Sequence, residues 1–258
     1  MEYQAFGSCD PGAATLVMLH EGLGSVAMWR DFPQSLASVL GVSVVAYSRY
    51  GYGQSAPARL NPRPVTYMHE EALSVLPQLL RGLEIERPIL LGHSDGGSIA
   101  LIHASRHPVR GVIAMAPHVF VEDLSVRSIA AAKVAYETTS LRERLARYHA
   151  NVDGAFWGWN DIWLHPDFRS WNIEGFLADI RSPVLVIQGT EDEYGTEDQV
   201  RAIAAGAGDV ELALMTECGH SPHRDQPARV MEAIRVWFDT KLGKNSESAS
   251  RRRTTSVT

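Results

Sequence analysis

The sequence predicts an α/β fold: a mostly parallel central sheet with helices on both faces, into which a small, mostly helical cap is inserted. Short apolar runs alternate along the chain with longer segments of helical periodicity, which is typical of strand-helix-strand units. The runs are continuously apolar, as expected for strands buried on both faces of a parallel sheet. Glycine-bearing loops follow three of them, and ligands of such sheets bind beyond the carboxyl ends of the strands.

The alternation places most elements of the core. The first half of the chain contains four predicted strands, at residues 15–19, 42–47, 89–91 and 111–116. Segments of helical periodicity follow the first three, at about 28–40, 68–83 and 96–106. The pattern resumes near the end, with strands at 184–188 and 211–215 and helices ending at about 205 and spanning about 228–241. Residues 1–116 and 182–242 are therefore predicted to form one α/β core.

Residues 117–181 interrupt the alternation and are interpreted as the cap, packed over the strand ends. They contain two helical stretches, at about 125–135 and 140–152. A cluster of aromatic side chains follows: Phe156, Trp157, Trp159, Trp163, Phe168, Trp171 and Phe176. We expect most of these rings to form a small core of the cap itself. Others are expected to line an apolar pocket, because small-molecule sites are mostly apolar with few polar groups.

The composition is that of a globular protein. The 258 residues are 45% hydrophobic and 21% charged, with a net charge of −6, which argues against a nucleic-acid-binding protein because such proteins carry a basic stripe. Residues 243–258 differ, since they carry four basic side chains against one glutamate, and they are predicted to form a disordered basic tail. Two cysteines, and ten histidines without metal-ligand spacing, indicate neither a disulfide framework nor a metal site.

The first residues and the apolar runs indicate where in the cell the protein is expected. The first residues lack the pattern of a secretory signal, and no apolar run reaches the length of a membrane span. We therefore expect a cytoplasmic protein that binds neither nucleic acid nor a membrane. Its partner is expected to be a small-molecule substrate, with no cofactor and no metal ion.

Residues 92–96 carry the strongest chemical signal in the chain. Their sequence, Gly92-His93-Ser94-Asp95-Gly96, fits the G-x-S-x-G pattern of a nucleophile elbow, in which a strained turn between a strand and a helix exposes the serine hydroxyl. A predicted strand precedes the pattern and a predicted helix follows it, as the motif requires. A side chain at either glycine would crowd the neighbouring strand or helix. Ser94 is therefore the candidate nucleophile.

A serine hydroxyl is a poor nucleophile until a base takes its proton and a third group orients that base. Asp192 lies directly after the predicted strand 184–188, and His220 directly after the strand 211–215. The carboxyl ends of parallel strands share one edge of the sheet, so both candidates lie on the same edge as Ser94. Glu191 is the alternative for the acid and His223 the alternative for the base. Along the chain the candidates come in the order serine, acid, histidine, which is one of the orders found in catalytic triads. The sequence therefore predicts nucleophilic catalysis.

These motifs resemble the α/β-hydrolase superfamily over about residues 15–241. The resemblance implies that Ser94 is the nucleophile, His220 the general base and acid, and Asp192 the carboxylate that orients it. It also implies an oxyanion hole made by the backbone N–H groups of Leu23 and Asp95. The matching pieces are His20-Glu21-Gly22-Leu23, Arg49-Tyr50-Gly51-Tyr52-Gly53-Gln54-Ser55, Gly92 to Gly96, Gly189-Thr190-Glu191-Asp192 and Gly219-His220.

Within the superfamily, the Ser94-Asp95-Gly96-Gly97 and Gly22-Leu23-Gly24-Ser25 segments are similar to serine esterases of the valacyclovir hydrolase group. That similarity implies that Asp95 helps to bind an amine of the substrate. His93 departs from the group, which tends to have tryptophan there. The alternative for Asp95 is a structural role, because an aspartate near the start of a helix interacts favourably with the helix dipole.

Four further side chains are weaker candidates for substrate binding, and two histidines are interpreted as structural. His93 is expected to pack behind the elbow, and His20 to bond backbone groups beside the oxyanion turn. The substrate-binding candidates, besides Asp95, are His118, Trp157, Trp159 and Trp163.

The sequence thus predicts a cofactor-independent serine hydrolase that cleaves an ester or thioester of a small, largely apolar acid through an acyl-enzyme. The same residues would also serve a carbon-carbon bond hydrolase of ring-cleavage products, or a lactonase. An alternative from another class is a non-catalytic receptor that uses the pocket of a hydrolase fold to bind a small molecule.

Overall fold

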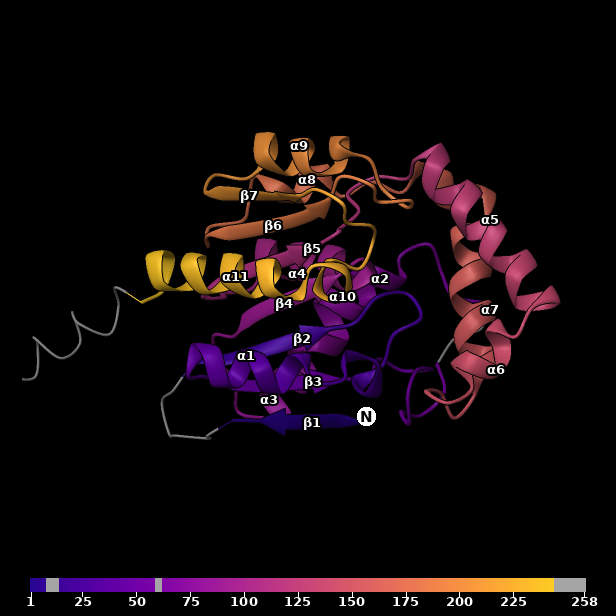
Figure 1. Cartoon of the computed structure of the whole chain (residues 1–258), viewed down its shortest axis with the longest axis horizontal. Coiled ribbons are helices and arrows are strands. Elements are labelled where there is room, and N and C mark those ends of the chain that lie inside the picture. Colours follow the sequence, from indigo (N-terminus) through magenta and orange to yellow (C-terminus); the bar gives the residue numbers. More distant parts are fainter. Residues whose placement is uncertain (8–13, 59–61, 244–258) are drawn as a thin grey trace, which may run out of the picture.

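The computed structural model of the protein describes residues 1–7, 14–58 and 62–243 (Figure 1). Within these ranges seven strands form one sheet in the order β1-β3-β2-β4-β5-β6-β7, with only β1 antiparallel to its neighbour. The predicted α/β fold with a mostly parallel sheet is therefore confirmed. The strands are β1 (Tyr3–Phe6), β2 (Thr15–Leu19), β3 (Ser43–Tyr47), β4 (Ile89–His93), β5 (Gly111–Met115), β6 (Val184–Gly189) and β7 (Val210–Met215).

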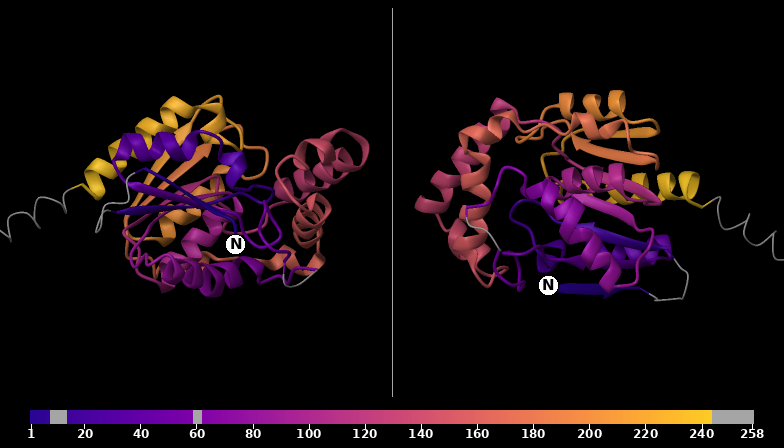
Figure 2. Two further views of the ribbon diagram at one scale, coloured as in Figure 1. Left: turned by 90° about the horizontal axis from the view of Figure 1, so that it is seen from below. Right: turned by 180° about the vertical axis from the view of Figure 1, so that it is seen from behind.

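Helices cover both faces of the sheet, which explains why the central strands are apolar throughout (Figures 1 and 2). In β4, Leu90 packs on one face while Ile89 and Leu91 pack on the other, and all three are fully buried. One face carries α1 (Phe32–Leu40) and α11 (Pro227–Lys241). The opposite face carries α2 (Tyr67–Glu70), α3 (Leu76–Gly82), α4 (Asp95–Arg106), α8 (Glu174–Leu177) and α9 (Glu197–Gly206).

The cap segment forms a separate layer of helices beyond the carboxyl ends of the strands (Figure 2). This layer consists of α5 (Asp123–Thr138), α6 (Leu141–Leu145) and α7 (Val152–Trp163). A 3₁₀ turn (Pro166–Ser170) then leads to α8, which packs back against α4 and α9. The aromatic side chains of this segment pack on one another, as predicted. Their cluster is not separate from the core, however, because Phe156, Trp163, Phe168 and Trp171 belong to the same apolar cluster as Leu90.

Several elements differ from the sequence prediction, most of them for identifiable reasons. The helix predicted at 28–40 begins only at Phe32, since Pro33 lacks an N–H and is tolerated in the first turn of a helix. Helix α7 was expected only as an aromatic cluster, and its Trp and Phe side chains obscure the helical period. Strand β1 is short and mostly exposed, so it lacks the apolar run that marks the central strands. The short helix α10 (Pro222–Asp225) was also not predicted.

Proline also explains a break in the helix predicted at 68–83. A π-helical turn (Glu71–Val75) separates α2 from α3, and the N–H of Leu76 bonds the carbonyl of Glu71. The next residue, Pro77, has no N–H to offer the carbonyl of Ala72. The Nδ1–H of His103 on α4 donates to that carbonyl instead, at 2.8 Å. Burial lowers the pKa of His103 to about 4.

The turn between β4 and α4 has a backbone conformation that residues other than glycine rarely adopt. Ser94 has φ 53° and ψ −118°. A Cβ on Gly92 would lie 2.1 Å from the carbonyl oxygen of Gly96, and a Cβ on Gly96 would lie 2.1 Å from that of Leu19 at the end of β2. The start of α4 therefore touches both its own strand and the neighbouring one. This contact explains why the pattern needs both glycines.

Two further observations concern the predicted tail and the membrane. Apart from Gly243, the predicted basic tail lies outside the described residues. Within the described ranges, no helix has both the length and the apolar character needed to span a bilayer.

We predict that Gly96→Ala destabilises the protein by about 1–3 kcal/mol, the range typical of overpacked sites, because its Cβ would overlap the backbone of β2. Gly82→Ala is the matched control, since Gly82 is also helical and a Cβ there meets nothing within 4 Å. Its free energy of unfolding should stay the same or rise, because alanine favours helices. Urea unfolding followed by circular dichroism measures both. Equal stability of the two variants would contradict this interpretation of the elbow.

We predict that the free energy of unfolding falls as the pH decreases from 7 to 5. The pKa of His103 is about 4 in the folded protein against an ordinary value of 6.5. The unfolded chain therefore binds a proton that the folded protein excludes, so the stability present above pH 6.5 is lost as the pH falls. His103→Gln keeps a donor for Ala72 without the titration. This variant should lose about 2 kcal/mol less than the wild type over that interval. An unchanged loss, measured by urea unfolding at both pH values, would show that His103 does not contribute.

Candidate active site

Three side chains from three loops meet at the carboxyl edge of the sheet. Ser94 follows β4, Asp192 follows β6 and His220 follows β7. The Oγ of Ser94 lies 2.9 Å from Nε2 of His220, and the Nδ1 of His220 lies 2.8 and 2.9 Å from the two carboxylate oxygens of Asp192. The structure thus brings together the three residues that the sequence singled out, with His220 within hydrogen-bond distance of the other two. This geometry allows a proton to pass from the hydroxyl to the imidazole.

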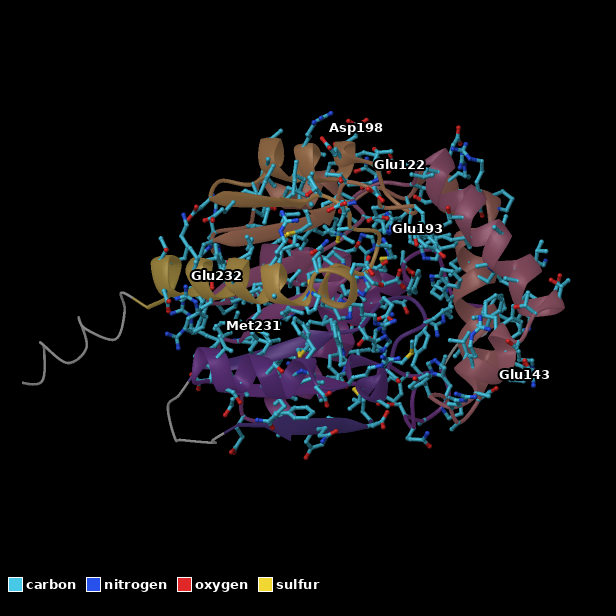
Figure 3. All side chains as sticks on the ribbon, viewed as in Figure 1. Glu122, Glu143, Glu193, Asp198, Met231 and Glu232 are labelled. Atoms are coloured by element: carbon cyan, nitrogen blue, oxygen red, sulfur yellow. The ribbon has the colours of Figure 1, made fainter. Side chains whose placement is uncertain are left out.

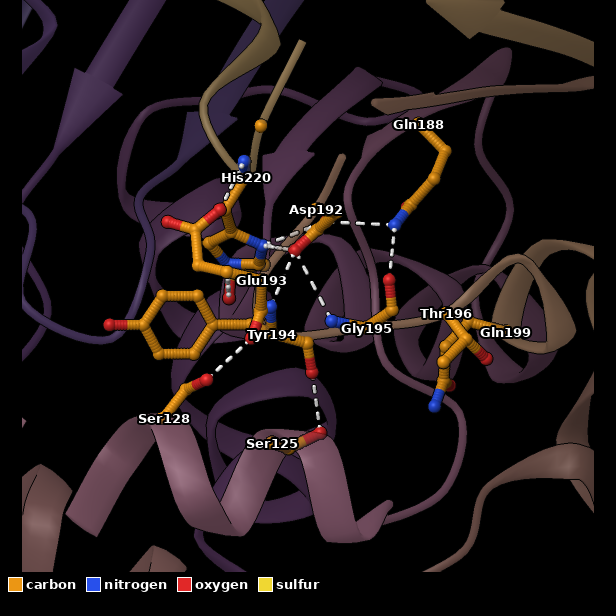
Figure 4. Close-up of polar contacts among 12 residues, drawn as sticks. Ser125, Ser128, Gln188, Asp192, Glu193, Tyr194, Gly195, Thr196, Gln199 and His220 are labelled. Atoms are coloured by element: carbon orange, nitrogen blue, oxygen red, sulfur yellow. Dashed lines mark hydrogen bonds and ion pairs between the residues drawn. The ribbon is translucent and has the colours of Figure 1, made fainter. Parts of the chain in front are cut away.

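The carboxylate of Asp192 is held by its own loop (Figure 4). Its Oδ1 accepts from the backbone N–H of Tyr194 at 2.8 Å and of Gly195 at 3.2 Å. Its Oδ2 accepts from the side-chain amide of Gln188 at 2.8 Å. Burial raises the pKa of Asp192, but the hydrogen bond and charge of His220 outweigh this effect and hold that pKa below its ordinary value. Asp192 is therefore a fixed anion beside the imidazole.

Gln188 is a site residue that the sequence analysis missed, although a signal was present. It is a polar residue near the end of an otherwise apolar buried strand, β6, and it is 1% exposed. A buried amide requires hydrogen-bond partners. Its Nε2 donates both to Asp192 and to the carbonyl of Gly195, at 2.8 and 3.0 Å.

The loop that bears Asp192 is also anchored to the cap (Figure 4). The hydroxyl of Ser125 donates to the carbonyl of Tyr194 at 2.6 Å, and that of Ser128 donates to the carbonyl of Glu193 at 2.5 Å. Both serines lie on α5. The position of this cap helix is therefore tied directly to the loop carrying the carboxylate.

Backbone contacts and ring packing hold His220. Its N–H donates to the carboxylate of Glu193 at 3.1 Å, and its carbonyl accepts from Nε2 of His93 at 2.6 Å. The ring of Tyr194 packs against the imidazole with centroids 4.7 Å apart. Glu193 lies between the sheet and α5 (Figure 3). His93 packs behind the elbow, where the sequence analysis expected it.

The two alternative site residues lie elsewhere. Glu191 is exposed, and its backbone N–H bonds the carbonyl of Cys218. His223 is buried with its ring 5.1 Å from that of Trp29 and 5.3 Å from that of Phe32, and burial lowers its pKa to about 2. Neither side chain has a hydrogen bond to the other candidates. The geometry therefore favours Asp192 and His220.

The backbone N–H groups of Leu23 and Asp95 have no hydrogen-bond acceptor among the described residues. Leu23 lies inside a tight turn that is closed by the bond from the N–H of Gly24 to the carbonyl of Glu21, at 3.1 Å. Asp95 is the first residue of α4, where N–H groups lack helical partners. Such free donors can bind the negative oxygen of a tetrahedral intermediate. They belong to the loops after β2 and β4, which are adjacent strands.

A cavity of about 240 Å³ opens onto Ser94 and His220. Of the weaker candidates, His118, Trp159 and Trp163 line it. Burial, and then the nearby charge of His220, lower the pKa of His118 to about 4, so this ring is neutral near pH 7. The other lining residues are Glu21, Gly22, Leu23, His93, Ile129, Glu193, Tyr194 and Ser221.

Trp157 and the carboxylate of Asp95 do not line the cavity, although both were predicted to bind the substrate. On α7, residues four apart share a face, so Trp159 and Trp163 point together while Trp157 points away. Trp157 packs edge-on against Tyr136, with ring centroids 5.5 Å apart. The carboxylate of Asp95 is fully buried, and it accepts hydrogen bonds from the hydroxyl of Tyr67 and the indole N–H of Trp163.

His20 has the structural role that was expected. Its Nε2 accepts the backbone N–H of Arg49 at 3.0 Å, and its Nδ1 bonds the carbonyl of Glu21 at 2.7 Å. Among the described residues, no group of three or more His, Cys, Asp or Glu side chains is arranged to hold a metal ion.

The sequence from residue 16 to residue 233 matches the alpha/beta hydrolase family. It is 24% identical to 2-hydroxy-6-oxo-6-phenylhexa-2,4-dienoate hydrolase of Comamonas testosteroni, with 80% of each chain covered. It is 25% identical to proline iminopeptidase of Lactobacillus delbrueckii subsp. bulgaricus, covering 87% of this chain and 90% of that protein.

The fold is also similar to that of a solved structure, the enol-lactonase from Burkholderia xenovorans LB400. The TM-score is 0.71, with 19% identity over 90% of this chain and 94% of that one. These relatives are hydrolases named for different substrates, and the family match spans most of the chain. This protein therefore belongs to the alpha/beta hydrolase family.

Proposed function

We propose that this hydrolase is a serine esterase or thioesterase that acts on a small, largely apolar acid. The observation that carries the proposal is the chain of contacts from Ser94 Oγ through His220 to Asp192, with distances of 2.8–2.9 Å. The chain ends at a cavity lined by the same serine and histidine. A nucleophile, a base and an orienting acid in that arrangement activate a hydroxyl for attack on a carbonyl.

The reaction proceeds in two halves. His220 takes the proton of Ser94 as its oxygen attacks the carbonyl carbon, and the imidazolium is stabilised by Asp192. The negative oxygen of the tetrahedral intermediate is bound by the N–H groups of Leu23 and Asp95. His220 then gives its proton to the leaving alcohol or thiol, and an acyl-enzyme remains. A water molecule, deprotonated by His220, attacks the acyl-enzyme. The imidazolium then returns this proton to the oxygen of Ser94, as its bond to the acyl carbon breaks and the acid is released.

The volume and the lining of the cavity support the proposal that the acyl group is small and largely apolar. Its volume of about 240 Å³ suits a short chain or a single ring, and Ile129, Trp159 and Trp163 supply apolar surface. Trp159 touches the oxyanion turn, since a Cβ on Gly22 would lie 2.1 Å from its Nε1. The acyl group would therefore lie between α7 and the elbow.

The same residues would also serve a lactonase or a carbon-carbon bond hydrolase. Two of the similar proteins are a reason to test both reactions. One relative is named a hydrolase of a phenylhexadienoate, and one similar fold is that of an enol-lactonase. A panel of esters, thioesters, lactones and 2-hydroxy-6-oxo-6-phenylhexa-2,4-dienoate at equal concentrations distinguishes these reactions. The substrate with the highest kcat/KM identifies the bond.

We predict that Ser94→Ala lowers the kcat for p-nitrophenyl butyrate by about 10⁴-fold or more, because no other hydroxyl of the described residues hydrogen-bonds the imidazole of His220. Ser105→Ala is the control, since Ser105 lies at the far end of α4 and bonds the carbonyl of Ile102. It should keep wild-type kcat. A fluorophosphonate should label the wild type at Ser94 and fail to label Ser94→Ala. A folded wild type that binds ligands without being labelled would instead indicate a receptor.

We predict that Trp159→Leu shifts the preference toward longer acyl chains, because it enlarges the cavity beside Ser94. The ratio of kcat/KM for p-nitrophenyl octanoate to that for the butyrate should rise several-fold. Trp157→Leu, on the opposite face of α7, should leave this ratio unchanged. Equal shifts in both variants would contradict the assignment of the acyl pocket.

A further inference from the structure

One buried guanidinium joins the loops that follow three adjacent strands. Arg49 follows β3 and is 2% exposed. The loops that follow β2 and β4 carry the two free N–H groups of the proposed oxyanion hole. The position of Arg49 between these loops is not required by the chemistry described so far, because its side chain does not line the cavity.

The first set of contacts is with the turn that contains Leu23. The Nη2 of Arg49 donates to the carbonyl of Glu21 at 2.8 Å and approaches that of His20 at 3.4 Å. The carbonyl of Glu21 also accepts the N–H of Gly24, the bond that closes this turn. The guanidinium therefore fixes one end of the turn and, through it, the direction of the Leu23 N–H.

The second contact is with the start of α4. The Nη1 of Arg49 lies 3.5 Å from Oδ2 of Asp95, which is fully buried. The hydroxyl of Tyr67 donates to the same oxygen at 2.8 Å, and Nε1 of Trp163 on α7 lies 3.3 Å from the other oxygen. These donors hold the side chain of the residue whose backbone N–H is the second free donor.

Stability alone is a poor explanation for this arrangement. Removing two charges from water costs several kcal/mol for each ion, and apolar residues of similar volume often stabilise a protein as well or better. A guanidinium offers donors in a fixed planar fork, so it can hold two acceptors at a set separation. Here those acceptors, the carbonyl of Glu21 and the carboxylate of Asp95, belong to the two donor-bearing segments.

We propose that Arg49 is a positioning residue for the oxyanion hole, setting the distance between the N–H groups of Leu23 and Asp95. The proposal rests on the esterase function proposed above. Arg49 acts through the two segments and does not touch the substrate. Arg49 therefore stabilises the transition state, in which the oxyanion forms, and does not change the affinity for the substrate.

The test compares Arg49→Met with the wild type, using p-nitrophenyl butyrate as substrate and butylboronic acid as a mimic of the tetrahedral intermediate. The kcat should fall by roughly 10- to 100-fold, less than is typical for loss of a whole oxyanion donor. The KM should change by less than about threefold, because ground-state contacts remain. The inhibition constant of butylboronic acid should rise by a factor similar to the fall in kcat. Arg49→Lys should recover little of the kcat, since an ammonium cannot span both acceptors.

A double variant separates positioning from charge balance. Arg49→Met leaves the buried carboxylate of Asp95 without its cation, whereas Arg49→Met with Asp95→Asn removes both charges. The double variant should regain thermal stability and keep the low kcat. Recovery of both stability and kcat would show that Arg49 only balances a charge, and would overturn the proposal.

Arg63→Met is the matched control. Arg63 is also buried, at 9% exposure, and its guanidinium lies 4.4 Å from the ring centre of Tyr52 without contacting either donor-bearing segment. It should keep wild-type kcat, and an equal loss in this variant would overturn the proposal. Wild-type kcat and inhibition constant in folded Arg49→Met would also overturn it while leaving the esterase function intact. A wild type without ester turnover or labelling at Ser94 would overturn the esterase function and this inference together.

Discussion

The close approach of backbone at the elbow is the constraint on which the site depends. Because Gly92 and Gly96 have no side chains, the first turn of α4 lies against both β4 and the end of β2. This contact holds Ser94 in a conformation with positive φ, which few non-glycine residues adopt. It also brings the first N–H groups of a helix beside the loop that follows β2. This backbone contact therefore places the hydroxyl of Ser94 and the N–H of Asp95 beside the loop that carries Leu23.

Buried polar groups hold the remaining loops in place. Gln188 and the backbone of 194–195 fix the carboxylate of Asp192, while His93 bonds the carbonyl of His220. Arg49 joins the loops after β2 and β4. Such groups are costly to bury unless each finds a partner, so a small displacement of one loop leaves several of them unpaired. This cost keeps the loops at one edge rigid relative to one another.

The cap contributes to the site as well as covering it. Trp159 and Trp163 form part of the cavity wall, and two serines of α5 bond the loop that carries Asp192. The indole N–H of Trp163 also reaches the buried carboxylate of Asp95. The cap is therefore linked both to the acid loop and to the elbow. Its apolar side chains are continuous with the core on one face of the sheet.

From the sequence we could predict the α/β alternation, the elbow, and the three residues that meet at the edge of the sheet. These follow from local signals, since apolar runs mark buried strands and parallel strands end at a common edge. The packing of distant segments sets three features that the residue pattern left open: Trp157 points away from the cavity, Asp95 is already bonded, and Arg49 spans two loops. Those outcomes depend on contacts between segments far apart in the chain. Many of these contacts are with backbone carbonyls, and because every residue has one, the residue type does not show which carbonyl is bonded.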